Sequence, residues 1–302
     1  MQLSVIIPTY NRKDSLQRLL WSLTKQINVE LEIIVIDQNP RGFFETGYFD
    51  GLEQVRFVEL QIPNVSAARN LGFCLSRAKS VVFIDDDLLP EVDFCVKGIE
   101  VFEKYNFIES FVPHVYCDDK SQYSNTPTSK VIPHTSNFGD IFLILDTISA
   151  CVFFRRNAFI KYGGFNPYHF EFARTGEDQE FFLRMNKKGG KLWYCNSLSV
   201  FHDEKVAGGC ELRTQDYWIT RKKCLRGIVM RLCFQRYDGK LRIMDFLEAS
   251  RFILLNSKIL SMSPSEIIKN VKLYFVVIDE SSAFIEARGW SNINKESYLE
   301  LI

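Results

Sequence analysis

Three consecutive aspartates, Asp85, Asp86 and Asp87, follow the apolar run 80–84. They lie where a buried strand would leave its sheet. Clustered carboxylates repel one another and resist desolvation, so a chain that places three together usually offsets the cost with a bound cation. The cluster therefore predicts a divalent metal that carries a phosphorylated ligand. The alternative is that one or two of the aspartates cap the helix expected near Glu91, and Asp86 is best suited to such a structural role.

The spacing of the outer two aspartates supports the metal hypothesis. Asp85 and Asp87 are two residues apart, so in an extended chain their side chains lie on the same side. A metal held at Asp87 can bridge a diphosphate and stabilise the charge that the diphosphate gains on leaving. The chain contains neither a P-loop nor a GxGxxG motif, so the phosphates of a nucleotide must be neutralised in another way.

Strand and helix patterns alternate in the first hundred residues, which predicts a parallel α/β sheet with crossover helices. The expected strands are 3–7, 31–37, 55–60 and 80–85, and the expected helices are 13–26, 65–77 and 91–105. In such sheets, ligands bind beyond the carboxyl ends of the strands. Thr9, Asp37 and the three aspartates all follow such ends, so one ligand could meet all of them.

The pattern changes after residue 107. The segment 117–139 is polar and contains two prolines, which predicts a loop that could act as a lid or a binding element. From residue 215 onward the pattern is mainly helical, and the polar segment 291–302 is expected to fray. The other expected elements are strands at 108–116, 145–154, 192–194 and 199–201, a turn at 163–167 and a helix at 178–187.

Composition is that of an ordinary soluble globular protein with one large domain, or one domain and a smaller appendage. Lys and Arg together number 37 and so do Asp and Glu, so no global charge indicates a nucleic-acid partner. The eight cysteines show no CxxC or zinc spacing, and no signal peptide pattern precedes the first strand, which favours a reducing, cytoplasmic compartment. No apolar run approaches the roughly 18 residues of a membrane span.

A basic segment in the C-terminal region allows two interpretations. Residues 221–242 contain eight Lys or Arg and one acid, and Leu225, Val229 and Leu232 fall on one helical face. Such a helix could lie on the anionic inner face of a membrane, as a peripheral contact. It could equally be a solvated basic helix that packs on the main domain through its apolar stripe.

Six motifs, in order along the chain, resemble those of inverting family 2 glycosyltransferases. They are VIIPTYNR at 5–12, VIDQN at 35–39, NVSAARNLG at 64–72, FIDDD at 83–87, GGF at 163–165 and GEDQEFFLRM at 176–185. The resemblance covers residues 3 to about 202. It implies the GT-A fold, a mostly parallel α/β sheet flanked by helices, here followed by a helical C-terminal extension.

The resemblance also implies a division of the chain. Residues 1–210 would form the catalytic domain, with a nucleotide-binding half at 1–105 and an acceptor and catalytic half at 106–210. Residues 211–302 would form the helical C-terminal region.

The resemblance assigns roles in binding the sugar donor. It places Pro8, Thr9 and Asp37 around the nucleobase and Arg69 near the base or the diphosphate. Asp85 would face the ribose or a metal-bound water, and Asp86 is grouped with these donor-binding residues. Asp87 would ligate Mn²⁺ or Mg²⁺ on the diphosphate, and His202 matches a histidine that completes the metal site in some members. Taken singly, these side chains have structural readings as a helix cap, a turn residue, a surface charge or a hydrogen-bonded histidine.

Asp178 is the candidate catalytic base. Transfer with inversion needs a carboxylate that takes a proton from the acceptor hydroxyl while that oxygen attacks the anomeric carbon. The resemblance assigns this role to the acidic pair Glu177-Asp178, and a helix N-terminus there would favour the ionised carboxylate. Asp178 could alternatively be an ordinary N-cap residue. Glu177 would orient the hydroxyls of the acceptor.

The implied activity is a metal-dependent sugar transfer from a nucleotide diphosphate sugar to a glycan or lipid-linked saccharide in cell-surface polysaccharide synthesis. UDP is favoured, although only Asp37 remains where many members carry two acids. One rival is a sugar nucleotidyltransferase, but 5–12 lacks the early basic glycine-rich loop that such enzymes normally need. The other is a nucleotide-sugar-binding scaffold with a decayed site, which the retained Asp85, Asp87 and Asp178 disfavour.

Overall fold

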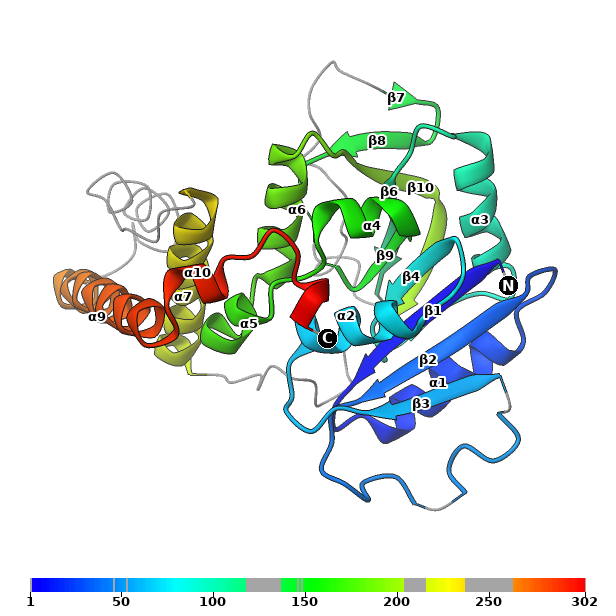
Figure 1. Ribbon diagram of the computed structural model, residues 1–302, viewed down its shortest axis with the longest axis horizontal. Coiled ribbons are helices and arrows are strands. Elements are labelled where there is room, and N and C mark those ends of the chain that lie inside the picture. Colours follow the sequence, from blue (N-terminus) through cyan, green and yellow to red (C-terminus); the bar gives the residue numbers. More distant parts are fainter. Residues whose placement is uncertain are drawn as a thin grey trace.

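The computed structural model describes residues 2–45, 47–52, 54–117, 137–145, 147, 149–203, 216–236 and 263–301. They form one mixed sheet with the strand order β3-β2-β1-β4-β9-β6-β10-β8-β7, and the two-residue strand β5 pairs with β10. Helices cover both faces of the sheet, and a helical region extends to one side (Figure 1). The predicted α/β class with a helical C-terminal region is confirmed.

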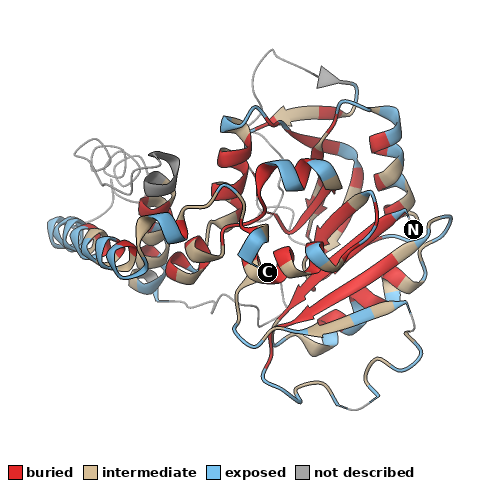
Figure 2. Ribbon diagram, in the orientation of Figure 1, coloured by how far each residue is buried: buried red, intermediate tan, exposed pale blue. Residues whose placement is uncertain are grey.

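The first half of the sheet is parallel. Its strands are β3 (Val55–Glu59), β2 (Leu31–Asp37), β1 (Leu3–Thr9) and β4 (Ser80–Ile84). β1 and β2 are buried along most of their length (Figure 2), as expected for apolar strands covered on both faces. Helix α1 (Lys13–Thr24) packs on one face and α2 (Val65–Leu75) on the other.

The second half of the sheet mixes both directions. β9 (Cys151–Arg155) runs antiparallel between β4 and β6 (Ser110–Tyr116), whereas β10 (Leu192–His202) runs parallel to β6. β8 (Ile141–Ile144) and β7 (Asn137–Phe138) complete the edge. The sheet is therefore parallel in its larger strands, with β9 and β8 reversed.

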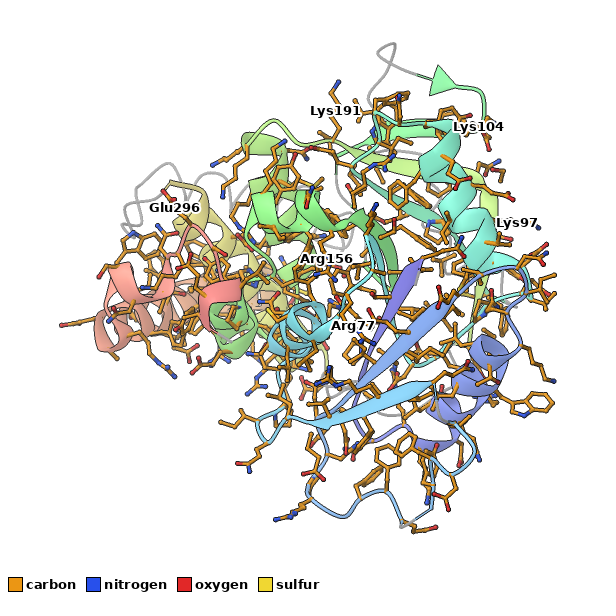
Figure 3. All side chains as sticks on the ribbon, turned by 45° about the vertical axis from the view of Figure 1, so that its right-hand side comes forward. Arg77, Lys97, Lys104, Arg156, Lys191 and Glu296 are labelled. Atoms are coloured by element: carbon orange, nitrogen blue, oxygen red, sulfur yellow. The ribbon has the colours of Figure 1, made fainter. Side chains whose placement is uncertain are left out.

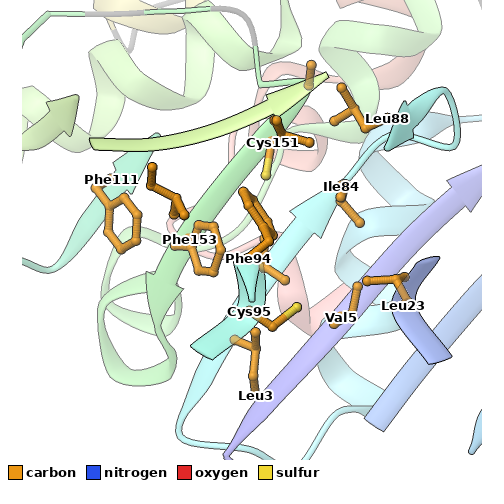
Figure 4. Close-up of a cluster of buried hydrophobic side chains, with 14 of the residues drawn as sticks. Leu3, Val5, Leu23, Ile84, Leu88, Phe94, Cys95, Phe111, Cys151 and Phe153 are labelled. Atoms are coloured by element: carbon orange, nitrogen blue, oxygen red, sulfur yellow. The ribbon is translucent and has the colours of Figure 1, made fainter. Parts of the chain in front are cut away.

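The helices of this half continue the two layers. Helix α3 (Phe94–Lys104) lies over the face that α1 covers, where Phe94 and Cys95 pack against Val5 and Phe153 (Figure 4). The opposite face carries α4 (Arg156–Tyr162) and α6 (Glu177–Lys187), which share a phenylalanine-rich cluster with β4 and β9. The short helix α5 (Pro167–Ala173) joins this layer to the C-terminal helices.

Two sequence expectations are wrong in this region, and one short strand was missed. The predicted strand 145–154 starts only at Cys151, because the backbone before it bonds to the site instead of to a neighbouring strand. The strands predicted at 192–194 and 199–201 are one strand, β10, whose pairing with β6 is interrupted between Cys195 and Ser199. The strand β5 (Leu88–Leu89) was not predicted, since two residues give no periodicity.

The C-terminal region contains α7 (Tyr217–Arg236), α9 (Pro264–Arg288), α10 (Trp290–Ile293) and the 3₁₀ helix η2 (Leu299–Leu301). The expected fraying of 291–302 is wrong for residues 291–301, because Tyr298 is buried and η2 contacts α2 (Figure 1). The proposed domain boundary at 210 and most of the predicted loop 117–139 lie outside the described residues.

Helix α7 packs through the apolar stripe seen in the sequence. Leu225 and Val229 are buried against α5 and α9, while the side chain of Leu232 lies outside the described part. Arg221 is buried and donates from Nε to Asn270, and Lys222 pairs with Glu280 of α9 at 2.6 Å. The packed alternative is thus the arrangement that the structure shows for this part of the helix. None of the described helices is both long and apolar enough to cross a membrane.

Candidate active site

The candidate site lies at the carboxyl ends of β1, β2 and β4, which carry Thr9, Asp37 and the three aspartates as expected, and β10 also ends there. The backbone N–H of Asp85 donates to the carbonyl of Ala150 at 2.8 Å, which ties the end of β4 to the segment before β9. Three residues after Asp85, β5 begins and pairs with β10 so that Leu88 lies opposite His202. This pairing explains how His202 comes beside Asp87, more than a hundred residues away in the chain.

Arg12 is the cation nearest to the acidic cluster. Its Nη1 lies 2.8 Å from Asp86 Oδ1 and 2.6 Å from Asp87 Oδ2, and all three side chains are largely buried. Thr9 donates its hydroxyl to Asp86 Oδ2 at 2.7 Å, so both carboxylate oxygens of Asp86 are engaged inside the protein. His202 Nε2 lies 3.3 Å from Asp87 Oδ2.

These contacts separate the titration of the two neighbouring aspartates. Burial raises the pKa of Asp86 to about 7, against the opposing effects of Arg12 and Thr9. Burial acts in the same sense on Asp87, but the hydrogen bond from His202 and the charge of Arg12 outweigh it and lower the pKa of Asp87. Asp87 therefore stays ionised. Its second oxygen, Oδ1, is buried and accepts no hydrogen bond from the described residues.

The end of β2 forms a polar turn against the end of β1. Asp37 Oδ1 accepts hydrogen bonds from the backbone N–H and the side-chain amide of Asn39, at 2.9 and 2.6 Å. Gln38 donates its backbone N–H to the carbonyl of Thr9, and its side chain accepts from the N–H of Asn64. Burial raises the pKa of Asp37. Pro8 is buried within β1, opposite Ile36.

Arg69 joins the acidic cluster to the second acidic pair. It lies on α2, whose start is fixed by the Asn64 side chain accepting from the N–H of Ala67. Its Nη2 contacts Asp85 Oδ1 at 2.9 Å and its Nη1 contacts Glu177 Oε1 at 3.3 Å. The guanidinium is buried, with its carbon 5.1 Å from the centre of the Phe165 ring.

Asp178 lies in the first turn of α6, which begins after Gly176. Gly176 has φ +77°, a left-handed conformation that suits glycine and turns the chain into the helix. Asp178 Oδ2 accepts from the backbone N–H of Ser149 at 3.0 Å, and Oδ1 accepts from the N–H of Gln179 at 2.7 Å. Two backbone donors and the helix N-terminus all stabilise the ionised carboxylate.

Glu177 has the opposite environment. Burial, and then the charge of Asp178, raise the pKa of Glu177 to about 7, although Arg69 opposes both. A carboxyl group that is easily protonated thus lies beside the candidate base, an arrangement that can accompany distinct acid and base roles.

The structure brings most of the predicted residues together. Arg69, Asp85, Glu177 and Asp178 form one connected group, and Thr9, Asp86, Asp87 and His202 form another beside it. Asp37 and Pro8 lie at the adjoining strand ends, where Asp37 bonds to Asn39 and Pro8 pairs with Ile36 across the sheet. Sequence reasoning missed Arg12. Two features of the sequence could have found it. Three adjacent acids need a nearby cation, and Arg12 lies just after the first strand.

A comparison with protein families gives a match for more than half of the chain. The sequence model described as "Glycosyl transferase family 2" matches residues 4–163. The chain belongs to this family.

Individual relatives and solved structures agree with that assignment. An uncharacterized glycosyltransferase of Haemophilus influenzae is 28% identical over 189 residues, which are 61% of this chain and 61% of that protein. The poly(ribitol-phosphate) beta-N-acetylglucosaminyltransferase TarP of Staphylococcus aureus is 34% identical over 97 residues, 30% of each chain. These matches span less than two thirds of either relative.

The crystal structure of S. aureus TarS 1-349 in complex with UDP-GlcNAc superposes with a TM-score of 0.58 at 14% identity. The superposition covers 97% of this chain and 90% of that one. At this level of identity the likeness shows the fold, so the predicted GT-A fold is confirmed.

The donor set at the strand ends fits a hard divalent cation. Within the described residues, no three His, Cys, Asp or Glu side chains converge to form a closed metal cage. A closed cage is not expected for Mg²⁺ carried by a nucleotide, which typically uses one or two carboxylates together with substrate phosphates. The buried Oδ1 of Asp87, with no hydrogen bond from the described chain, is the oxygen that such an ion would use.

Proposed function

We propose that this chain transfers a sugar from a nucleotide diphosphate sugar, with UDP as the favoured nucleotide, to a hydroxyl group of a saccharide acceptor with inversion at the anomeric carbon. One observation carries the proposal: a single buried cation, Arg69, connects the carboxylates at the end of β4 to the carboxylates at the start of α6. A site with a phosphate-binding half and a proton-accepting half in direct contact suits this reaction.

Asp178 acts as the base in this proposal. Its two oxygens are fixed by the backbone N–H groups of Ser149 and Gln179, so the carboxylate cannot rotate away as the acceptor binds. A fixed carboxylate of this kind suits a group that accepts a proton in the transition state. Glu177, protonated below pH 7, can donate to an acceptor oxygen.

The donor half consists of Arg69, Asp85, Asp87 and His202, with Asp37 near the nucleobase. A divalent cation, Mn²⁺ or Mg²⁺, would be held by Asp87 and His202 and would neutralise charge on the leaving diphosphate. In this proposal Arg69 orients the donor from the side opposite to the cation. Asp86 differs from the rest because Thr9 and Arg12 take both of its oxygens, so its contribution is to fix Arg12.

The comparisons support the choice of substrates. TarS was crystallised with UDP-GlcNAc, and TarP is named as an N-acetylglucosaminyltransferase acting on poly(ribitol-phosphate). We therefore favour a UDP-sugar donor and a cell-surface polysaccharide or lipid-linked saccharide acceptor. We also propose that the protein acts in the cytoplasm, as predicted from the cysteines. Contact of α7 with an anionic membrane is a further part of the proposal.

The first test is calorimetric titration of UDP, dTDP and GDP into the purified protein, each with and without Mn²⁺. We expect UDP to bind in the presence of Mn²⁺ and Asp87→Ala to abolish this dependence on the metal. Asp93→Ala is a control, because Asp93 is an acid six residues further along the chain whose side chain pairs with the exposed Lys97. Radiolabelled UDP-sugars are then incubated with purified cell-surface polysaccharides. Absence of binding by all three nucleotides would overturn the proposal.

A further inference from the structure

The last described residues return from the C-terminal helices to the catalytic domain. We name residues 294–301 the C-terminal strap. Its backbone lies against the turn 163–165, where Tyr298 donates its N–H to the carbonyl of Gly163 at 2.7 Å. The strap reaches this turn after α7, α9 and α10, so it links the end of the chain to the GGF motif (Figures 1 and 3, Glu296 being labelled in the latter).

Both glycines of the turn are needed for this approach. A Cβ on Gly163 would lie 2.2 Å from the carbonyl oxygen of Glu296, and a Cβ on Gly164 would lie 2.8 Å from Leu299 Cδ2. Both glycines also have positive φ values, +79° and +71°, which side chains rarely allow. Asn70 Oδ1 lies equally close to Gly164, at 2.8 Å, so the turn is packed between α2 and the strap and its glycines suit both contacts.

Arg184 links the strap to the catalytic helix. Its guanidinium carbon lies 5.2 Å from the centre of the buried Tyr298 ring. The same guanidinium pairs with Glu180 at 2.8 Å and donates to the carbonyls of Tyr162 and Gly164. Arg184 and Glu180 belong to α6, the helix whose first turn carries Asp178. The strap thus covers the joint between α6 and the turn.

The other side of the turn reaches the second half of the site. Asn70 accepts from the N–H of Phe165 at 2.9 Å and donates to its carbonyl at 2.8 Å. The Phe165 ring lies under the guanidinium of Arg69, which contacts Asp85 and Glu177. A shift of the turn would therefore move the Phe165 ring that lies under Arg69. Through Arg184 and Glu180 it would also move the start of α6.

We propose that the C-terminal strap is a positioning element of the active site, with Tyr298 and Leu299 as its positioning residues. They touch no reacting group. They hold the turn 163–165 and Arg184, and through these they fix Arg69 relative to Asp178. The kinetic test of this proposal rests on the proposed sugar transfer. The coupling from the strap to α6 does not, because it is argued from contacts alone.

The test compares Tyr298→Ala, Tyr298→Phe and Leu299→Ala, with Leu301→Ala as a control at an exposed position of the same segment. We expect Tyr298→Ala to lower kcat about tenfold and to change KM for the donor less than about threefold, because the shift reaches the donor half only through Arg69 while the strand ends at Asp37 and Asp87 stay in place. Tyr298→Phe should restore kcat to within about twofold, since the ring and not the hydroxyl packs on Arg184. Leu299→Ala should lower kcat about threefold and Leu301→Ala should not change it.

Hydrogen exchange separates this inference from the proposed function. In Tyr298→Ala, amides of 163–184 should exchange faster, while those of β1 and β2 keep wild-type protection; a general loss of stability would raise exchange in both. This result is expected even if the wild-type protein transfers no sugar. Should Tyr298→Ala fail to fold, Leu299→Ala decides by the same measurements. Wild-type kcat and wild-type exchange in folded Leu299→Ala, or an equal loss in Leu301→Ala, would overturn the inference.

Discussion

The two acidic groups of the site are held by different kinds of partner. Asp86 and Asp87 are neutralised by the side chains of Arg12 and His202, whereas Asp178 is held by the backbone N–H groups of Ser149 and Gln179. Side-chain partners can move away at the cost of a few torsions. Backbone partners move only if the local fold changes. The first group is therefore adapted to exchange its cation, and the second to keep one carboxylate in place.

The difference extends to protonation. Burial and the charge of Asp178 raise the pKa of Glu177 to about 7, and burial raises that of Asp86 to about 7. Each group thus contains one carboxyl that is easily protonated. In the first group its neighbour Asp87 has a buried oxygen with no hydrogen bond from the described residues, and in the second its neighbour Asp178 is the proposed base.

The largest effect is expected from Asp178→Asn, which keeps the shape of the side chain but removes the base. We expect kcat to fall by about 10³-fold, within the range that general base catalysis supplies. The measurement is release of UDP under saturating donor and acceptor. UDP affinity should stay at its wild-type value, because Asp178 is bonded to the backbone N–H groups of Ser149 and Gln179 and is not among the residues proposed to bind the donor. Retention of more than a tenth of the wild-type kcat would show that another residue is the base.

A second prediction concerns stability and compares Glu177→Gln with the wild type. Between pH 4.5 and 7 the folded protein keeps a proton on Glu177 that the unfolded chain loses, so wild-type stability falls as pH rises through this window. The variant has no such group. The difference between the free energies of unfolding of Glu177→Gln and the wild type should therefore increase with pH in favour of the variant, by up to about 3 kcal/mol at pH 8.

Urea denaturation at pH 5 and pH 8 measures this difference. Glu171→Gln serves as the control, because Glu171 is partly exposed and pairs with Arg288 away from the site. If Glu177→Gln changes the free energy of unfolding by the same amount at both pH values, Glu177 is not the titrating group.

The first half of the fold could be predicted from sequence because its strands are continuous apolar runs separated by helices of regular periodicity. The bounds of β2 match the expectation, and β1, β3 and β4 differ from theirs by one or two residues. The segment before β9 could not be predicted. Ser149 and Ala150 look like strand residues, yet their backbone groups bond to Asp178 and Asp85 instead.

The site shows the same limit. Ordered motifs pointed to Arg69, Asp87 and Asp178, of which Asp87 follows a strand end, Asp178 lies in the first turn of a helix and Arg69 lies within α2. Motifs carry no information on which side chains satisfy one another, so the engagement of Asp86 by Thr9 and Arg12 was visible only in the structure. The docking of Tyr298 depended on contacts across more than a hundred residues, and a polar segment gives no periodicity from which to infer it.

The smallest of the three effects tests whether Arg12 is an exchangeable partner. Its Nη1 lies 2.6 Å from Asp87 Oδ2, so a divalent cation at Asp87 must work against a positive charge already in place. Arg12→Gln removes that charge. We expect the affinity for Mn²⁺ in the absence of nucleotide to rise about tenfold, a modest part of the interaction between two charges at this distance.

Titration of Mn²⁺ followed by electron paramagnetic resonance measures the affinity, and thermal unfolding in the presence of chelator gives a second readout. Without metal, Arg12→Gln leaves Asp86 and Asp87 without their cation, so the melting temperature should fall, and Mn²⁺ should restore it. Arg18→Gln is the matched control, because Arg18 pairs with Asp203 near the same strand ends and is half exposed. If Mn²⁺ affinity is unchanged and the loss of stability is not reversed by the metal, Arg12 is a fixed structural ion pair, and the two acidic groups are alike.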